Sequence, residues 1–127
     1  MTVEKLLQKA DQAVASAKVL LDTADTEGAC NRAYYGMFDA AKASLALVGA
    51  PQEVVDSKSH SGVLQAFGLY VVKAGRMPAE FGRSLRRVEE MRGAADYSTK
   101  DIPDEKAQWA VDEAVAFVAG VKGLKQS

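Results

Sequence analysis

With 127 residues, the chain has the size of one domain, for which about 100–200 residues are usual, and its 48% hydrophobic and 26% charged residues exclude a disordered or low-complexity protein. The net charge of −1 does not indicate nucleic acid as a partner, while one cysteine and one histidine exclude a disulfide framework, a thiolate metal cluster and a histidine-rich metal site, so we expect neither a metal nor a cofactor. No stretch approaches the ~20 consecutive apolar residues of a membrane helix, and residues 1–5 lack the start of a signal peptide, which predicts a cytoplasmic protein without membrane contacts.

Apolar residues recur every three or four positions along nearly the whole chain, which is the spacing of amphipathic helices. Glycine, proline and short polar stretches interrupt this pattern and act as helix stops and starts. The predicted helices cover roughly residues 2–23, 26–48, 59–75, 78–95 and 103–123. Because their connections are short, we expect an all-helical fold, a five-helix up-and-down antiparallel bundle that forms one domain over residues 1–127.

Small residues recur on one side of the second predicted helix, at Ala33, Gly36 and Ala40. Small side chains let a neighbouring helix approach closely. This pattern is typical of packing within the chain and equally of the seam of a homodimer, and the sequence does not choose between them.

A second stripe of the same helix lies nearly opposite its apolar face. Arg32, Tyr35, Gly36 and Asp39 follow the spacing i, i+3, i+4 and i+7, which places them on one side of a helix. Arg32 and Asp39 are spaced to contact one another or a ligand. The stripe is therefore either a solvated surface with an exposed tyrosine or a face for ligand binding or self-association.

Arg92 projects into the apolar stripe of the fourth predicted helix, between Val88 and Ala95. A buried arginine is costly unless it is paired. We therefore predict that Arg92 is at least half buried and paired with a carboxylate, with Asp96 one turn later favoured over Glu89 one turn earlier. Arg92 is then either a structural ion pair inside the bundle or a functional arginine that lines a groove.

Two further features bear on chemistry. From Lys73 to Arg92 there are more basic than acidic residues, so this helix offers either a modest phosphate-binding patch or a solvated basic face. His60, beside Ser59 at the start of the third helix, is the only group with an ordinary pKa near 7. It either helps to cap that helix or acts as a general base.

Three segments carry a family resemblance. Asn31–Ala41, which contains adjacent tyrosines, resembles the hallmark helix of HEPN domains, named for higher eukaryotes and prokaryotes nucleotide-binding. Lys58–Val63, followed by Phe67, and Met91–Tyr97 are similar to the same small bacterial and archaeal HEPN group. The three segments occur in order over roughly residues 26–100.

The resemblance implies an antiparallel helical bundle, commonly a homodimer, that is often paired with a minimal nucleotidyltransferase in toxin–antitoxin-like systems. Active members are metal-independent ribonucleases, whose motif is an arginine, four to six further residues and a histidine. Arg92 resembles the motif arginine, but Tyr97, preceded by Asp96, holds the place of the histidine. Arg32 with Asp39 is the other match, and there an aspartate stands where histidine is required.

These observations predict a binding module for a nucleotide or RNA that is homodimeric and partners a minimal nucleotidyltransferase. Arg92 and Asp96 organise its groove, and Arg32, Tyr35 and Asp39 form the rim of the groove or the dimer seam.

Two alternatives remain open from the sequence. One is a metal-independent ribonuclease that uses Arg92 together with His60, Tyr97 or Asp96, although the missing motif histidine favours poor cleavage or none. The other is a purely structural association domain.

Overall fold

The computed structural model describes residues 1–97 and 101–124, without the side chains of residues 94–97. Across these residues the chain is helical and contains no strand, which confirms the all-helical prediction. The elements are α1 (Val3–Asp22), α2 (Thr26–Leu47), α3 (Gln52–Val55), α4 (His60–Ala66), the π-helical segment η1 (Phe67–Val72), α5 (Ala79–Tyr97) and α6 (Asp104–Lys122). None of the described helices is long and apolar enough to cross a membrane.

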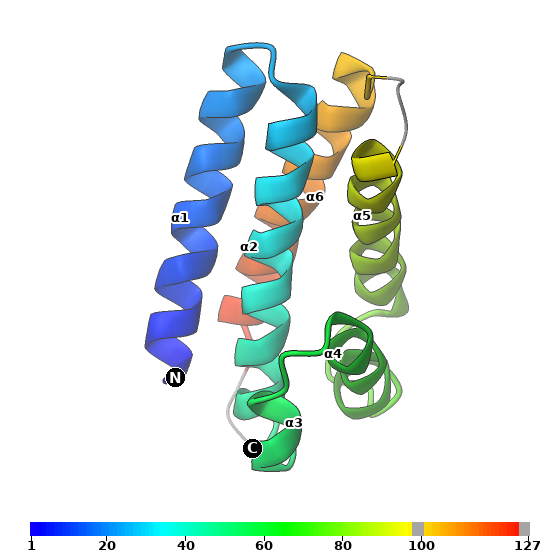
Figure 1. The fold of residues 1–127 in the computed structure, drawn as a ribbon. Coiled ribbons are helices and arrows are strands. Elements are labelled where there is room, and N and C mark those ends of the chain that lie inside the picture. Colours follow the sequence, from blue (N-terminus) through cyan, green and yellow to red (C-terminus); the bar gives the residue numbers. More distant parts are fainter. Residues whose placement is uncertain (98–100, 125–127) are drawn as a thin grey trace.

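Four long helices form an up-and-down bundle (Figure 1), in which α1 and α5 run in one direction and α2 and α6 in the other. The prediction of a bundle helix over residues 59–75 is wrong. This stretch divides into α4 and η1, which have only seven and six residues, and α4 lies across one end of the bundle and is seen nearly end-on. A segment this short cannot span the length of helices of 19–22 residues, and α4 packs against α2 through its first residue, His60, which contacts Tyr34 and Phe38.

Local sequence signals set the helix ends. Side-chain oxygens of Thr2, Asp25 and Ser59 accept hydrogen bonds from backbone N–H groups in the first turns of α1, α2 and α4, at 3.1, 2.9 and 3.1 Å. Gly49 and Gly75, which follow α2 and η1, both have positive φ angles, of 78° and 76°. Ser59 is therefore the residue that caps the helix on which His60 lies.

The small residues of α2 pack within the chain. Ala33 and Ala40 are both 0% exposed, and a Cβ added to Gly36 would lie 3.0 Å from Cγ2 of Val14 and 3.3 Å from the carbonyl oxygen of Ala10. Both of these atoms belong to α1. The side of α2 that carries these three residues is thus already covered by α1, so the interpretation of this stripe as a dimer seam is wrong.

The turn after α1 generates a stability prediction. Ala24 has a φ of +65°, and Asp25 and Ala24 donate backbone hydrogen bonds to Leu20 and Leu21, an arrangement that normally ends with glycine. A left-handed conformation costs a residue with a Cβ roughly 1–2 kcal/mol, and the greater freedom of glycine in the unfolded chain cancels part of that. We expect Ala24→Gly to raise the free energy of unfolding by about 0.5–1 kcal/mol, measured by thermal and urea unfolding.

Ala15→Gly is the matched control, because Ala15 is exposed within α1. It should lower the free energy of unfolding by about 1 kcal/mol. Equal destabilisation by both substitutions would show that the left-handed turn carries no strain.

Candidate functional site

The predicted residues Tyr35, His60 and Arg92 meet at one place in the fold. We call Tyr34, Tyr35 and Phe38 of α2, His60 of α4 and Arg92 of α5 the Tyr34 cluster. Tyr34 is its centre and is 0% exposed, whereas Tyr35, His60 and Arg92 are each partly exposed. The cluster therefore has a buried aromatic base and a polar surface of three different side chains.

His60 is held by aromatic rings on several sides. Its Nδ1 atom lies 2.7 Å from the hydroxyl oxygen of Tyr34, and its ring stacks on that of Phe38, with 4.3 Å between centroids and 17° between planes. The ring of Tyr35 meets it edge-on at 5.9 Å. Because His60 is the first residue of α4, the cap at Ser59 also fixes its backbone. The imidazole thus has a defined position, although it belongs to a short element.

Arg92 covers the other part of the tyrosine pair. The central carbon of its guanidinium lies 4.8 Å from the ring centroid of Tyr34 and 5.9 Å from that of Tyr35, a cation–π arrangement. More than half of the Arg92 surface is buried, as predicted, and its Nε atom is wholly buried. The predicted pairing with Asp96 stays a prediction, since the side chains of Asp96 and Tyr97 lie outside the described residues.

Burial and one nearby cation set the protonation of the cluster. Burial lowers the pKa of His60 below its usual value, and the positive charge of Arg92 lowers it further, while Glu89 acts in the opposite direction. Burial also raises the pKa of Tyr34 above its usual value, partly offset by Arg92. Near neutral pH the cluster therefore holds a protonated Tyr34, a neutral His60 and a charged Arg92.

The hydrogen bond to Tyr34 determines what His60 can do. A neutral imidazole carries one proton on one of its two ring nitrogens. If Tyr34 donates to Nδ1, the other nitrogen, Nε2, carries the proton and is a hydrogen-bond donor. If Nδ1 donates to the tyrosine oxygen, Nε2 is a proton acceptor. The first arrangement suits binding of a phosphate oxygen, and the second suits removal of a proton from a substrate.

Arg32 and Asp39 do not share the ring contacts of the cluster. Both are partly buried on α2, and the charges of Lys9, Lys42 and Arg32 lower the pKa of Asp39. Burial is nevertheless the largest influence and raises the pKa of Asp39. Of the stripe predicted on the second helix, Gly36 packs against α1 and only Tyr35 joins the Tyr34 cluster.

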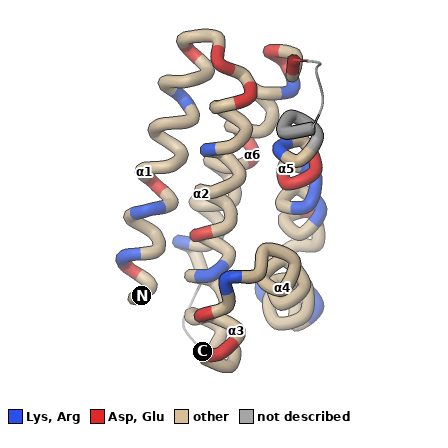
Figure 2. The backbone as a smooth tube through the Cα atoms, viewed as in Figure 1, with Lys and Arg blue, Asp and Glu red and all other residues tan. Residues whose placement is uncertain are grey.

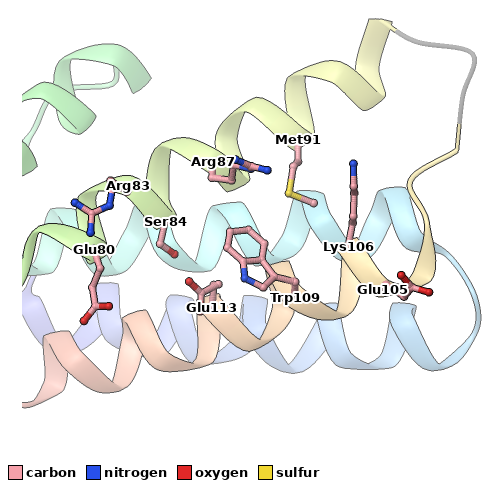
Figure 3. Close-up of a pocket in the computed structure, with 9 residues that line it drawn as sticks. All are labelled: Glu80, Arg83, Ser84, Arg87, Met91, Glu105, Lys106, Trp109 and Glu113. Atoms are coloured by element: carbon pink, nitrogen blue, oxygen red, sulfur yellow. The ribbon is translucent and has the colours of Figure 1, made fainter.

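A groove between α5 and α6 is a feature that sequence reasoning missed (Figure 3). It has a volume of about 650 Å³ and is lined by Glu80, Arg83, Ser84, Arg87, Met91, Glu105, Lys106, Trp109 and Glu113. The exposed basic face predicted for the fourth helix contributes Arg83 and Arg87 to it. The described residues contain no group of histidine, cysteine, aspartate and glutamate side chains that could hold a metal ion.

Comparison with known proteins decides the family. The HEPN domain matches residues 3–124, almost the whole chain. The chain belongs to the HEPN family. A protein of Methanocaldococcus jannaschii named as a candidate toxin is 32% identical over 120 residues, which cover 94% of this chain and 86% of the relative. The UPF0332 protein of Gloeobacter violaceus is 34% identical and covers 93% of both chains. A second candidate toxin of M. jannaschii is 28% identical, over 94% of this chain and 79% of the relative.

The charges around His60 generate a pH prediction. Because Arg92 lowers the pKa of His60 and Glu89 raises it, Arg92→Gln should raise that pKa and Glu89→Gln should lower it further. As the chain has one histidine, proton NMR titration of the imidazole signals gives each value without assignment of other residues. Asp11→Asn, on the far side of the bundle in an exposed ion pair with Lys122, is the charge control.

The same shift has a consequence for stability. The pKa of His60 is lower in the folded than in the unfolded protein. The contribution of His60 to the free energy of unfolding is therefore fully present above pH ~6.5 and is lost as the pH falls through the folded pKa.

If Arg92→Gln and Glu89→Gln shifted the pKa of His60 in the same direction, the two charges would not act on it as the geometry requires.

Proposed function

We propose that this HEPN protein is the RNA-binding component of a toxin–antitoxin-like system and contacts RNA at the Tyr34 cluster. The observation that carries this proposal is the convergence of His60 and Arg92 on the same tyrosine pair. These residues lie far apart in the sequence, and the fold brings a cation, a neutral imidazole and a partly exposed aromatic ring to one surface.

Each of these groups fits one part of a nucleotide. The guanidinium of Arg92 offers planar donors for a phosphate oxygen pair and carries its charge at every physiological pH. The partly exposed ring of Tyr35 is a surface on which a base can stack, as in other proteins that bind single strands. His60 adds a donor when Nε2 carries the proton.

The names of the relatives support the toxin-like part of the proposal. Two proteins of M. jannaschii that match nearly the whole chain are named as candidate toxins. A minimal nucleotidyltransferase as partner follows from the family resemblance, and we keep it as part of the proposal. We keep the cytoplasm as the proposed location, because both the partner and cellular RNA are available there.

A metal-independent ribonuclease is the second candidate, and one observation favours it. His60 precedes Arg92 in the sequence and does not complete the family motif in order, yet both contact Tyr34. With Nε2 unprotonated, His60 can accept the proton of a ribose 2′-hydroxyl. The freed oxygen then attacks the adjacent phosphorus, the bond to the 5′-oxygen breaks, and that oxygen takes up a proton. The products are a 2′,3′-cyclic phosphate and a 5′-hydroxyl.

One assay separates these functions. Purified protein is incubated with labelled single-stranded RNA in EDTA at low salt, and binding is followed by fluorescence anisotropy while cleavage is followed on a gel. We expect binding with little or no cleavage. Arg92→Gln should weaken binding roughly tenfold to a hundredfold, because a charged hydrogen bond contributes about 1.5–3 kcal/mol. Lys18→Gln, an exposed charge on α1, should change it little.

Two other results lead elsewhere. Cleavage in EDTA that both His60→Ala and Arg92→Gln abolish, while the variants stay folded by circular dichroism, would make the ribonuclease the function. Neither binding nor cleavage would leave a structural association domain.

The predicted homodimer is tested separately. The resemblance to HEPN domains motivates it, now without support from the small residues of α2. We expect sedimentation equilibrium at micromolar concentration to give a species of twice the chain mass of 13.5 kDa. A single species at the chain mass would contradict the dimer and would leave the Tyr34 cluster as a site of one chain.

A further inference from the structure

We propose that single-stranded RNA held at the Tyr34 cluster crosses the outer face of α5 and enters the groove between α5 and α6, where one base stacks on Trp109. This inference rests on the proposed function and adds to it a second contact site and a preference among bases. It is carried by the lining of the groove, by the exposed arginines of α5 and by the place of Trp109.

Trp109 is a large aromatic side chain that the fold leaves available. It is 39% exposed on α6, whereas Phe117 of the same helix is 0% exposed and its ring contacts that of Phe81. Figure 3 shows its indole directed toward α5, with Arg87 and Met91 reaching from the opposite wall. A base between these walls would have the indole on one side and a guanidinium on the other, an arrangement that favours stacking.

The volume of this groove fits one nucleotide, with the adjacent nucleotides of the strand outside the groove. The groove measures about 650 Å³, within the range of ~300–1,000 Å³ that small-molecule sites occupy. Figure 3 shows that the lining residues follow α5 and α6 over several turns.

The outer face of α5 connects the groove with the Tyr34 cluster. Arg83, Arg86 and Arg87 are spaced three and four residues apart, are all exposed, and have no hydrogen bond or ion pair to any residue that the structure describes. Figure 2 shows basic residues along this helix. Arg87 faces the groove, while Arg92 contacts α2 on another side of the same helix. As a helix is ~10 Å across, a few nucleotides suffice to bridge the two sites.

The two walls of the groove differ in charge, and this difference orients the chain. The α5 wall has a net positive charge, from Arg83 and Arg87 with Glu80 at one end, and the α6 wall has a net negative charge, from Glu105 and Glu113 with Lys106. Phosphates are attracted to the first wall and repelled by the carboxylates of the second. The base edge then faces α6, where a carboxylate accepts hydrogen bonds from exocyclic amino groups of adenine or cytosine. Uracil has no such amino group, so we infer a preference for oligo(A) and oligo(C) over oligo(U).

The single tryptophan of the chain makes the groove directly observable. Titration with oligo(A) in EDTA should quench or shift Trp109 fluorescence, and oligo(U) of the same length should require higher concentrations for the same change. Trp109→Leu should weaken binding of labelled oligo(A) roughly fivefold to a hundredfold by anisotropy, the range found for loss of one stacking residue. Val115→Ala is the matched control, since Val115 is 40% exposed on the same helix and does not line the groove.

The path over α5 is tested by salt dependence. Arg83→Gln and Arg86→Gln should each lower the slope of log affinity against log salt by about 0.7, the value for one phosphate contact on a single strand. Lys18→Gln on α1 should leave the slope unchanged.

The outcomes distinguish this inference from the proposed function. If RNA shifts the NMR signals of His60 while Trp109 fluorescence and the Trp109→Leu affinity stay unchanged, the second site is overturned and the proposed function stands. If RNA moves neither reporter, both fail. If Trp109 fluorescence changes with protein concentration without RNA, and Trp109→Leu abolishes self-association, the groove is an interface between copies and this inference is overturned.

Discussion

The hydrogen bond between the hydroxyl of Tyr34 and Nδ1 of His60 is the contact on which this face of the protein depends. Tyr34 is wholly buried on the central helix of the bundle, and a buried hydroxyl without a partner costs about 1–3 kcal/mol. His60 provides that partner and is also the first residue of α4. The same bond therefore gives the buried hydroxyl of Tyr34 a partner and fixes where the crossing segment, α4 and η1, starts against α2. This places the imidazole beside Arg92.

The protonation states within the Tyr34 cluster support one another. A second positive charge on His60 would lie next to the guanidinium of Arg92, and burial already disfavours it. Tyr34 keeps its proton because its pKa is raised by burial, so its hydroxyl can either donate a hydrogen bond to the imidazole or accept one from it. The cluster near neutral pH thus carries the charge of Arg92 over two tyrosine rings, with Glu89 close enough to act on His60. Because the cluster has one cation, the RNA that we propose as its ligand would place one phosphate there, and its other phosphates would need cations elsewhere on the surface.

The long helices and the burial of Arg92 could be predicted from the sequence, because both follow from local periodicity. The predicted ranges at residues 2–23, 26–48 and 103–123 end within one residue or two of α1, α2 and α6. The crossing segment could not be predicted, since the apolar stripe of residues 59–75 is also that of an ordinary bundle helix. The stripe identifies which residues are buried and does not identify which helix they pack against.

The site shows the same limit more sharply. Tyr34 has helical spacing typical of the core and is indeed fully buried, so nothing local indicates that its hydroxyl meets a histidine 26 residues away. Trp109 carries no local signal either, because its exposure depends on how far α5 lies from α6 at that point. Both features depend on the relative placement of helices, which a single sequence read by its periodicity does not contain.

The histidine beside Arg92 comes from a different helix, and this bears on whether the chain can act as a ribonuclease. In the ribonuclease motif implied by the resemblance, the histidine follows the arginine after four to six further residues, so the two are neighbours in the sequence. Here Arg92 is on α5 and the only histidine is on α4, joined through a buried tyrosine of α2. A base on that path can act only in the tautomer that leaves Nε2 unprotonated, and the hydroxyl of Tyr34 takes part in choosing the tautomer. Binding through Arg92 makes no such demand, since its charge and donors are present in either case. The arrangement is therefore better suited to the RNA binding that we propose than to cleavage, and replacement of Tyr34 by Phe would remove the hydroxyl that takes part in the choice of tautomer while leaving the ring beneath Arg92.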